Sequence, residues 1–320
     1  MQTLAEIAAA IKKLKSATIF THTRPDGDTL GSALALSYAL GSLGIPNEIV
    51  NDCDVPEKFF YLPDLKKVKK APTFEAEGYI CVDSSDENRL GNLAALYLSG
   101  AKKKVTINID HHVSNTSFAK YNFVRPCCAN CRNMAELLPL LGVKIDQKTA
   151  DALFLGLLTD SGNFSHSDVD GDAFRTAANL LDCGADACGL GYAVFRKQTK
   201  ARARLHAETM AGIRYLLSDR LAILTVTQEM LSRTGADRSE TEGFVDFALN
   251  VDTVEVAAAL LEVRPRQYKV SLRSKGKANV NEAAATFGGG GHVLASGCMI
   301  FGEWEEVIDK LRFAVSRQLD

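Results

Sequence analysis

Short apolar runs alternate with amphipathic segments over the first 190 residues of the chain. Runs rich in Ile, Val and Phe lie at 17–22, 47–51, 78–83 and 105–110. Apolar residues recur every three or four positions at 31–44, 132–141, 147–158 and 171–182. The short runs are typical of buried strands, and the longer periodic segments are typical of helices. This alternation predicts an α/β domain with a mainly parallel sheet and helices on both faces.

The pattern changes near residue 219. Further strands are predicted at 220–227, 254–263, 267–274 and 295–301, with helices near 239–250, 279–286 and 303–319. We therefore expect a smaller, mixed-sheet α/β domain over 219–320. Residues 186–218 carry a helical pattern with many charges, which suits a solvated face, and we interpret them as a helical connector. The first domain then covers residues 1–185.

Composition narrows the class of protein. A chain of 320 residues suits two domains, and 46% hydrophobic with 24% charged residues is typical of soluble globular proteins. The net charge of −2 gives no basic field, which argues against long nucleic acid as a partner. A small anionic ligand remains compatible with this charge.

The N-terminus and the cysteines carry no targeting or redox signature. Residues 1–20 predict an amphipathic helix running into a strand rather than a secretory signal, and no apolar run is long enough to span a membrane. We expect a cytoplasmic protein with no membrane partner. Cys127, Cys128 and Cys131 contain one C-x-x-C spacing without a second pair, so we expect a structural role rather than a zinc or redox site.

Ionisable side chains gather where the predicted elements of the first domain end. On an extended strand Asp110 and His112 share one face, and His111 lies on the other. Because ligands bind at the carboxyl ends of the strands in an open α/β sheet, we expect the cluster to converge there. Its members are His22, Asp26, Asp28, Asp83, Asp110, His111, His112 and Asp160.

Aspartates brought this close raise one another's pKa unless a cation joins them. Mixed Asp and His ligands favour Mn²⁺ or a similar ion, and there are too many for a single ion. Two divalent cations bridged by a carboxylate are the arrangement used for attack on phosphorus. Each motif alone has a simpler interpretation: a packed histidine pair, an Asp-Gly-Asp turn or a helix N-cap. Their occurrence together favours the two-metal site.

The second domain offers groups that recognise anions. Gly289, Gly290 and Gly291 allow close approach of the backbone and present N–H groups to phosphate. His292 follows directly, and Arg273 ends a predicted strand with a planar fork suited to phosphate. In isolation these residues would be interpreted as a flexible loop and a surface charge. Weaker candidates for the same basic rim are Arg264, Arg266 and Lys275.

Together the motifs resemble the DHH phosphoesterases, which are named for the sequence found here as Asp110-His111-His112. The segment "SLRS" followed by "FGGGGHVLASG" resembles their DHHA1 domain, so the resemblance covers essentially the whole chain. Two positions depart from the family pattern. Asp160-Ser161-Gly162 replaces Asp-Thr-Gly, and "CCANCRNMAE" replaces a stretch of Ser, Thr and small residues, which concerns substrate fit rather than catalysis.

The resemblance implies a role for each residue of the first domain. His22 and Asp26 would bind one Mn²⁺ ion, and Asp28 and His111 the other. Asp83 would bridge the two ions, and Asp160 would complete the set. His112 would donate to the substrate phosphate, and Asp110 would orient a neighbouring histidine. The nucleophile would be a water molecule activated by the ions.

The resemblance also suggests the substrates. Two-domain members of this kind resemble oligoribonucleases that degrade very short RNA and remove the 3′-phosphate of 3′-phosphoadenosine 5′-phosphate (pAp). A short nucleotide ligand needs a few phosphate contacts and a stacking surface, not a long basic groove. The alternative is a phosphodiesterase for cyclic dinucleotides or their linear products. If the chain were a non-catalytic nucleotide-binding protein, we would expect at least one of the metal ligands to be missing from the sequence. A homodimer is compatible with the resemblance, because related proteins are often dimers.

Overall fold

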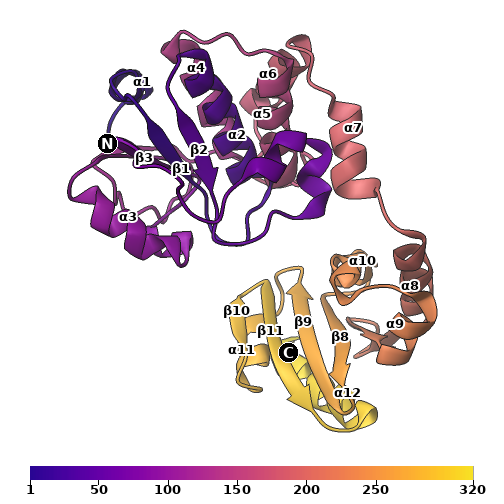
Figure 1. Ribbon diagram of the computed structural model, residues 1–320. Coiled ribbons are helices and arrows are strands. Elements are labelled where there is room, and N and C mark those ends of the chain that lie inside the picture. The colour runs from indigo at the N-terminus through magenta and orange to yellow at the C-terminus, as the bar shows by residue number, and fades with distance from the viewer. Residues whose placement is uncertain (320) are drawn as a thin grey trace. The chain divides into compact units, whose positions relative to one another are not determined.

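A computed structural model describes residues 1–319 of the chain. The chain divides into two compact units, residues 1–197 and the residues from 198 onward. This division lies inside the segment 186–218 that the sequence predicts as a connector. The two units are described separately (Figure 1).

The first unit contains a five-stranded sheet in which every strand pair is parallel. The strand order is β2-β1-β3-β4-β5. The strands are β1 (Ala17–Phe20), β2 (Asn47–Val50), β3 (Gly78–Val82), β4 (Val105–Asp110) and β5 (Tyr121–Val124). The predicted parallel α/β architecture is therefore confirmed for this unit.

Helices pack on both faces of this sheet. The α-helices are α1 (Leu4–Ile11), α2 (Gly27–Ser42), α3 (Leu93–Ala101), α4 (Asn130–Leu141), α5 (Gln147–Asp160), α6 (Gly171–Asp182) and α7 (Ala187–Gly191), followed by a π-helical turn η4 (Tyr192–Arg196). Short 3₁₀ turns are η1 (Glu57–Tyr61), η2 (Pro63–Lys67) and η3 (Glu87–Leu90). Figure 1 shows α2, α4 and α5 together on one side of the sheet and α3 on the other.

The alternation of side chains along the strands explains the two covered faces. Ile80 and Val82 of β3 belong to the main core with the buried residues of α2, α4 and α5. Tyr79 and Cys81 point the other way, into a smaller cluster with Tyr97 of α3. Both faces are therefore apolar, as the continuous hydrophobic runs of the sequence predict for a parallel sheet.

The strand order creates a natural ligand-binding edge. In a sheet of order 2-1-3-4-5, the connections leave β1 and β3 toward opposite sides, which opens a crevice at the carboxyl ends of these two strands. His22 follows β1 and Asp83 follows β3 directly, and β1 pairs with β3 in register from Ala17↔Gly78 to Phe20↔Cys81. The topology thus brings these two side chains to the same point of the crevice.

The second unit contains a six-stranded mixed sheet of order β10-β11-β9-β8-β7-β6. Its strands are β6 (Arg214–Leu216), β7 (Leu221–Val226), β8 (Val256–Arg264), β9 (Gln267–Ser274), β10 (Gly290–His292) and β11 (Ala295–Phe301). The pair β7–β8 is parallel and the other pairs are antiparallel. The predicted mixed-sheet α/β fold is confirmed.

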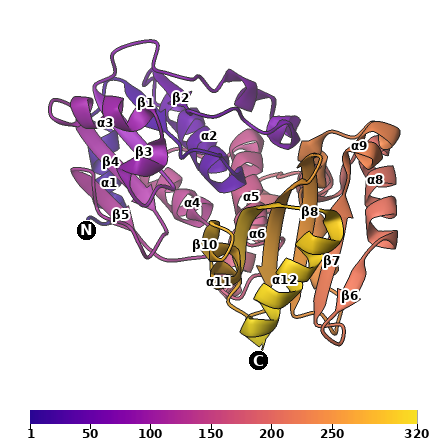
Figure 2. The same ribbon diagram turned by 90° about the horizontal axis from the view of Figure 1, so that it is seen from below.

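Helices cover the faces of this second sheet unequally. Its helical elements are α8 (Lys200–Ala211), α9 (Gln228–Thr234), η5 (Arg238–Thr241), α10 (Phe244–Leu249), α11 (Val280–Ala285) and α12 (Trp304–Leu319). α11 and α12 bury one face along β7, β8, β9 and β11. On the other face, α8, α9 and α10 pack mainly over β7 and β8. Figures 1 and 2 show α12 crossing one face of the strands only.

The structure differs from the sequence expectation in several short elements. Residues 214–216 form edge strand β6, although the sequence suggests helix there, because Leu217, Ser218 and Asp219 all adopt positive φ and turn the chain back into β7. Strands β5 and β10 and helices α3 and α9 are also present without having been predicted. No helix among residues 1–319 is both long and apolar enough to cross a membrane.

Close packing of α2 against α5 gives a stability test. A Cβ at Gly31 would overlap the carbonyl oxygen of Ala152 in α5, whereas a Cβ at Gly41, in the same helix, would meet no atom within 4 Å. Gly31→Ala is expected to lower the free energy of unfolding by roughly 1–3 kcal/mol, because backbone cannot easily move aside. Gly41→Ala should be neutral or stabilising by up to about 1 kcal/mol. Urea denaturation of both variants measures the difference, and equal stabilities would contradict the packing.

Candidate active site

The loop between β1 and α2 supplies the first part of the candidate site. Asp26 is the N-cap of α2, and its Oδ1 accepts hydrogen bonds from the backbone N–H groups of Asp28 and Thr29, each at 3.0 Å. Its other oxygen, Oδ2, lies 3.5 Å from Nε2 of His22. One carboxylate therefore both starts a helix and faces a histidine.

Asp28 is a fully buried carboxylate in the first turn of α2. Its oxygens accept the backbone N–H groups of Asn130 at 2.5 Å and Cys131 at 2.9 Å, which are the first residues of α4. These N–H groups have no partner within their own helix, and the positive end of the helix dipole also favours a carboxylate there. Asp28 thus joins α2 to α4 while its Oδ2 lies 3.9 Å from Nε2 of His111.

Asp83 lies between two imidazole rings. Its Oδ2 is 3.5 Å from Nε2 of His22, and its Oδ1 is 3.2 Å from Nε2 of His111. The residue is only 2% exposed and has a φ of 55°, a left-handed conformation that is uncommon outside glycine. Such strain persists where the surrounding structure enforces it, and here it directs a carboxylate into the crevice immediately after β3.

Both of these histidines turn the same ring nitrogen toward the cluster. Nδ1 of His22 lies 2.9 Å from the carbonyl oxygen of Thr23, and Nδ1 of His111 lies 2.7 Å from that of Cys127. Since a carbonyl can only accept, Nδ1 donates in each ring. Nε2 then faces the carboxylates, which is the orientation of metal-binding histidines whose other nitrogen is held by a carbonyl.

Asp110 and His112 form a second, adjoining pair. Nδ1 of His112 lies 2.8 Å from Oδ1 of the buried Asp110, and Asn115 donates to Oδ2 of Asp110 at 2.6 Å. The two residues share one side of the chain, as strand alternation predicts. His112 is 29% exposed and packs edge-on against His111, with ring centroids 4.4 Å apart. It is therefore the imidazole of this group that a ligand could reach.

Asp160 ends α5 at the open side of the cluster. Its Oδ2 lies 3.5 Å from Nε2 of His111, and its side chain is 31% exposed. Its backbone carbonyl accepts a hydrogen bond from Nδ1 of His166 at 2.8 Å. His166 also packs so closely against Gly162 that a Cβ there would overlap the ring. His166 thus stabilises the end of α5 by packing against it. Among the described residues, it belongs to none of the potential metal-binding groups.

Proximity of these charges shifts the pKa of the carboxyl groups. Burial, followed by the charges of Asp83 and Asp160, raises the pKa of Asp28 well above its ordinary value. Burial and the charge of Asp83 raise the pKa of Asp160 to about 6. For Asp110, burial alone would raise the pKa, but the hydrogen bonds from His112 and Asn115 outweigh it and lower the pKa. Negative charge is therefore in excess around Asp28 and Asp160 but compensated at Asp110.

The donor atoms fit divalent cations. Among the described residues, three groups bring potential ligand atoms within 4.8 Å of one another, and two of them share Asp83. Nε2 of His22 and Oδ1 of Asp83 are buried without a hydrogen-bond partner, which is costly unless another species binds them. The groups are His22, Asp26 and Asp83; Asp28, His111 and Asp160; and Asp83, Asp110, His111 and His112.

The structure thus brings together all eight ionisable residues that the sequence singles out in the first unit. Sequence reasoning missed the groups that hold them in place. These are the carbonyls of Thr23 and Cys127, the N–H groups at the start of α4, and Asn115. The amino-acid sequence does not indicate which backbone groups will hold these side chains. Asn115, however, lies close enough to Asp110 in the sequence to have been considered.

The cysteines near the site are packing residues. Cys131 Sγ lies 3.4 Å from Oγ of Ser32 and 3.6 Å from the carbonyl oxygen of Asp28. Burial raises the pKa of Cys131, and likewise that of Cys127 and Cys128, so that all three favour the neutral thiol. The three potential metal-binding groups found among the described residues contain no cysteine.

The candidate anion-binding residues of the second unit lie at one end of its sheet. Gly290 and His292 pair with Gly297 and Ala295 of β11, and Ala295 pairs in turn with Arg273 of β9. His292 and Arg273 therefore lie in one row of the sheet, on the same face. Gly289 packs directly against the backbone of Gly297, where a Cβ would overlap the carbonyl oxygen, and Gly291 has a φ of 152°. Arg273 Nε lies 3.3 Å from Oδ1 of Asp246 in α10.

The weaker basic candidates do not form one rim. Arg264 and Arg266 lie at the turn between β8 and β9, at the opposite end of β9 from Arg273, so the expectation that they join Arg273 is wrong. A hairpin turn places them there, which their short separation in sequence conceals. Lys275 does lie at the Arg273 end, where its Nζ donates to the carbonyl oxygens of Val251 at 2.7 Å and Asp252 at 3.3 Å.

Comparison with known families agrees with this geometry. Residues 16–157 match the N-terminal domain of the DHH family, and residues 219–319 match the DHHA1 domain. The first match includes all of the clustered residues except Asp160, which lies three residues beyond it. The second includes Arg273 and the glycine-rich segment.

Individual proteins are similar to this chain over almost its full length. The bifunctional oligoribonuclease and PAP phosphatase NrnA of Thermus thermophilus is 29% identical, covering 99% of this chain and 95% of the relative. The protein of the same name from Bacillus subtilis is 24% identical, covering 94% of each chain. The crystal structure of an exopolyphosphatase-related protein from Bacteroides fragilis has the same fold, with a TM-score of 0.87, 24% identity and coverage of 98% of this chain and 95% of that one.

The histidine pKa values predict that metal binding releases protons. Burial alone would lower the pKa of His22, but the neighbouring carboxylates of Asp26 and Asp83 raise it to about 10. Burial likewise opposes the rise at His111, but the carboxylate of Asp83 raises its pKa to about 11. In the metal-free protein both rings are protonated at neutral pH, and a cation must displace these protons. Apparent metal affinity should therefore rise with pH up to about 11.

Calorimetric titration of the metal-free protein with Mn²⁺, in buffers of different ionisation enthalpy, measures the released protons. A rise in pH increases the metal affinity but lowers the stability of the metal-free fold. Without metal, the raised pKa values stabilise the fold fully below the ordinary value of 6.5. This contribution is lost as the pH rises through about 10 for His22 and about 11 for His111. Metal binding without proton release at pH 7 would contradict the assigned geometry.

Proposed function

The chain belongs to the DHH/DHHA1 family of phosphoesterases, and we propose that it is a two-metal hydrolase of short oligoribonucleotides that also removes the 3′-phosphate of pAp. The family match in both units and the full-length similarity to proteins named as bifunctional oligoribonuclease and PAP phosphatase support this proposal. The products are mononucleotides from RNA and a nucleoside 5′-monophosphate from pAp.

One observation carries the proposal: Asp83 directs one oxygen toward His22 and the other toward His111. A carboxylate placed in this way can serve two cations at once. His22 and Asp26 would hold one, and Asp28, His111 and Asp160 the other. When bound, two divalent cations supply positive charge to the reacting phosphate and lower the pKa of a water molecule. We propose Mn²⁺, since the donor set mixes imidazole with carboxylate.

His112 and Asp110 provide the remaining chemistry of the first unit. His112 is the partly exposed ring of the cluster, so it would donate to a phosphate oxygen or to the leaving group. Asp110 accepts from Nδ1 of His112, which leaves Nε2 of that ring to face the substrate. The buried carboxylate of Asp110 thereby fixes the orientation of the His112 ring.

The second unit would recognise the anionic substrate. Arg273 and His292 share one row of the sheet, and Gly289, Gly290 and Gly291 permit close approach of the backbone to a phosphate. We keep as a proposal the domain limits predicted from the sequence, residues 1–185 and 219–320 with a connector at 186–218. A cytoplasmic location and a homodimer stay predictions.

A panel of substrates tests the proposed function. With Mn²⁺ present, the protein is expected to release mononucleotides from a labelled RNA dinucleotide and phosphate from pAp, because both place a phosphoester beside a nucleoside that the second unit can hold. A cyclic dinucleotide serves as the third substrate. Turnover of the cyclic compound alone would establish the alternative activity, and no turnover of any substrate by protein shown to contain both metals would refute the hydrolase.

Substitution of Asp83 tests the shared carboxylate. Asp83→Ala is expected to reduce metal content and to lower kcat/KM by a factor on the order of 10³ or more, because both cations lose a ligand. Asp54, whose side chain is 97% exposed, offers a matched control in Asp54→Ala. Metal content by atomic emission and turnover of pAp are measured on both variants. Retained activity in Asp83→Ala would show that this residue does not bridge the metals.

A further inference from the structure

Helices α11 and α12 of the second unit have a hollow between them. Both helices bury residues in the same core, over one face of the second sheet. The hollow has a volume of about 540 Å³, which is within the range of small-ligand sites. We call it the helix groove. Among the residues that line it are Glu282 and Phe287 on the α11 side, and Lys310, Phe313, Arg317 and Gln318 on α12.

The periodicity of α12 places its lining side chains in one stripe. Lys310, Phe313 and Arg317 lie three and four positions apart, and Ala314 and Gln318 directly follow two of them. Residues at these spacings share one face of a helix. Ala314 is buried and also lines the groove, so its short side chain leaves space between the longer ones. The groove therefore results from a small residue within a stripe of large residues.

Two aromatic rings line the helix groove. The ring of Phe313 is 65% exposed, whereas Phe287 is partly buried against the core of the unit. Phe287 follows the end of α11, where its backbone N–H donates to the carbonyl oxygen of Ala284 at 3.0 Å. Covering an exposed phenyl ring with another planar group is favourable, and every nucleobase has a face that stacks on such a ring.

Positive charge exceeds negative charge in the helix groove. The guanidinium of Arg317 lies 6.0 Å from the centroid of the Phe313 ring and has no carboxylate partner among residues 1–319. Nζ of Lys310 donates to the carbonyl oxygen of Phe301 at 3.1 Å, and an ammonium group has two further N–H donors. Of the described lining residues, Glu282 alone contributes a carboxylate. Two cations with one carboxylate favour an anionic ligand.

A pair of polar side chains connects the two helices. Nε2 of Gln318 donates to Oε2 of Glu282 at 3.3 Å, and Nδ2 of Asn279 donates to the other oxygen of Glu282 at 3.0 Å. The carboxylate keeps unused lone pairs, and the Gln318 amide keeps a second N–H and a carbonyl oxygen. The edge of a nucleobase presents both donors and acceptors, so these two side chains can bind it.

The helix groove is separate from the candidate anion-binding residues of the same unit. Leu272 of β9 is buried in the core formed with α11 and α12. Because side chains alternate along a strand, the next residue, Arg273, points to the opposite face of the sheet. Arg273 there lies 3.3 Å from Asp246 of α10. The groove and Arg273 therefore lie on opposite sides of one sheet.

We propose that the helix groove binds a nucleoside monophosphate. Phe313 would stack on the base, Glu282 and Gln318 would contact the edge of the base, and Lys310 and Arg317 would hold the phosphate. The choice of a monophosphate rests on the proposed function, because the proposed hydrolase releases nucleoside monophosphates. The protein would then hold its product at a site made wholly of second-unit residues.

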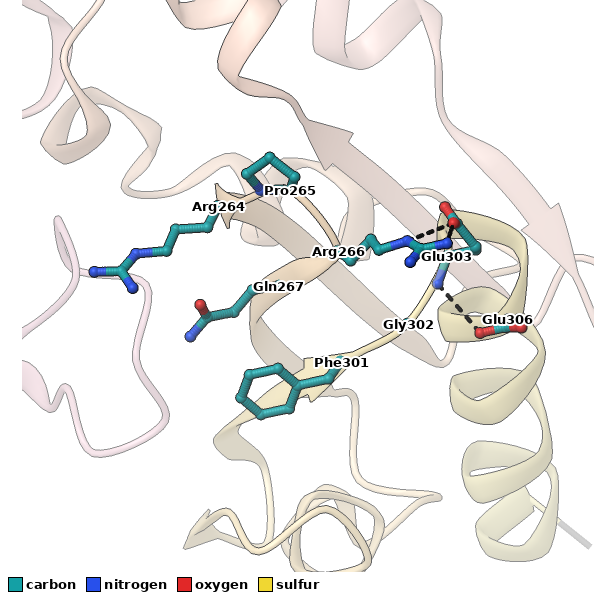
Figure 3. A pocket seen from close by; sticks show the side chains of 8 residues that line it. All are labelled: Arg264, Pro265, Arg266, Gln267, Phe301, Gly302, Glu303 and Glu306. Atoms are coloured by element: carbon teal, nitrogen blue, oxygen red, sulfur yellow. Dashed lines mark hydrogen bonds and ion pairs between the residues drawn. The ribbon is translucent and has the colours of Figure 1, made fainter.

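Another hollow of the second unit suits a nucleotide less well. It has a volume of about 550 Å³ and lies at the turn between β8 and β9 (Figure 3). Two arginines and two glutamates line it, and one of each, Arg266 and Glu303, already form an ion pair. This hollow therefore has no excess of positive charge. Its exposed ring, Phe301, provides a control for Phe313.

Self-association explains the exposed ring of Phe313 less well. Stable dimers bury large interfaces with a mainly apolar centre. On α12, Phe313 is the exposed large apolar side chain, and the exposed residues around it include Asp309, Lys310, Arg312 and Arg317. A single ring among charged side chains fits a small, planar anion better than a second copy of the chain.

Photolabelling of the full-length protein tests this site. The probe is 8-azidoadenosine 5′-monophosphate at about 1 mM, irradiated with the protein in the presence of EDTA, and mass spectrometry identifies the labelled peptides. We expect label in peptides that contain residues 282–287 or 310–318, and we expect an excess of adenosine 5′-monophosphate to remove it. Label found only in other peptides, or no label, would overturn the proposal.

Variants of exposed side chains identify the contacts. Phe313→Ala and Arg317→Gln should each reduce the label in these peptides at least about fivefold, because the base or the phosphate loses a contact. Two controls should keep it within about twofold. They are Phe301→Ala, whose ring is 63% exposed, and Arg312→Gln, whose side chain is 51% exposed and pairs with Asp309. Equal labelling of all four variants would contradict the assigned contacts, and so would a change of oligomeric state by sedimentation in nucleotide-free Phe313→Ala.

The presence of EDTA separates this site from the proposed hydrolase. EDTA removes divalent cations and so prevents metal-dependent turnover, and the labelling therefore reports binding alone. Label in the helix groove of a protein that hydrolyses none of the substrates would support the groove and refute the hydrolase. Turnover of RNA or pAp by a protein without label in the groove would support the hydrolase and refute the groove.

Discussion

A carboxylate held between two imidazole rings organises the whole of the first unit. Asp83 is 2% exposed and contacts His22 on one side and His111 on the other. Burying an unpaired ionised carboxylate costs several kcal/mol, and Asp28 and Asp160 add like charge nearby. The surrounding fold compensates part of this charge with oriented N–H groups and protonated histidines, and cations would compensate the rest.

The parallel sheet is what makes this concentration of charge possible. Its strands all end at one edge, and the reversal of connections between β1 and β3 leaves that edge uncovered by backbone. Helices α2 and α4 begin there, so their unpaired N–H groups meet the carboxylates of Asp26 and Asp28. The same positions that complete the helices thereby supply the ligands, and the site needs no extra structural element.

Much of this arrangement could be predicted from the sequence, for identifiable reasons. Strand β4 is found at 105–110 as its apolar alternation indicates, and polar residues at strand ends converge because parallel strands share one edge. The left-handed conformation of Asp83 and the carbonyls that orient His22 and His111 could not be predicted, since they depend on backbone geometry. Short edge strands such as β6 and β10 carry too few residues to show a period. Arg264 and Arg266 were misplaced because a hairpin sends neighbours in sequence to the far end of a sheet.

Asp26 and Asp28 both hold the start of a helix and could bind a cation, and this affects how the sequences of relatives should be interpreted. One oxygen of Asp26 caps α2, and both oxygens of Asp28 hold the start of α4, independently of any cation. A lineage that abandoned catalysis would still be under selection to keep these two aspartates, because losing them uncaps helices in the core. Their retention is therefore weak evidence of activity in a diverged sequence. His22 and His111 cap no helix. Substitution of these histidines is therefore the earlier and clearer sign that a relative has lost its catalytic activity.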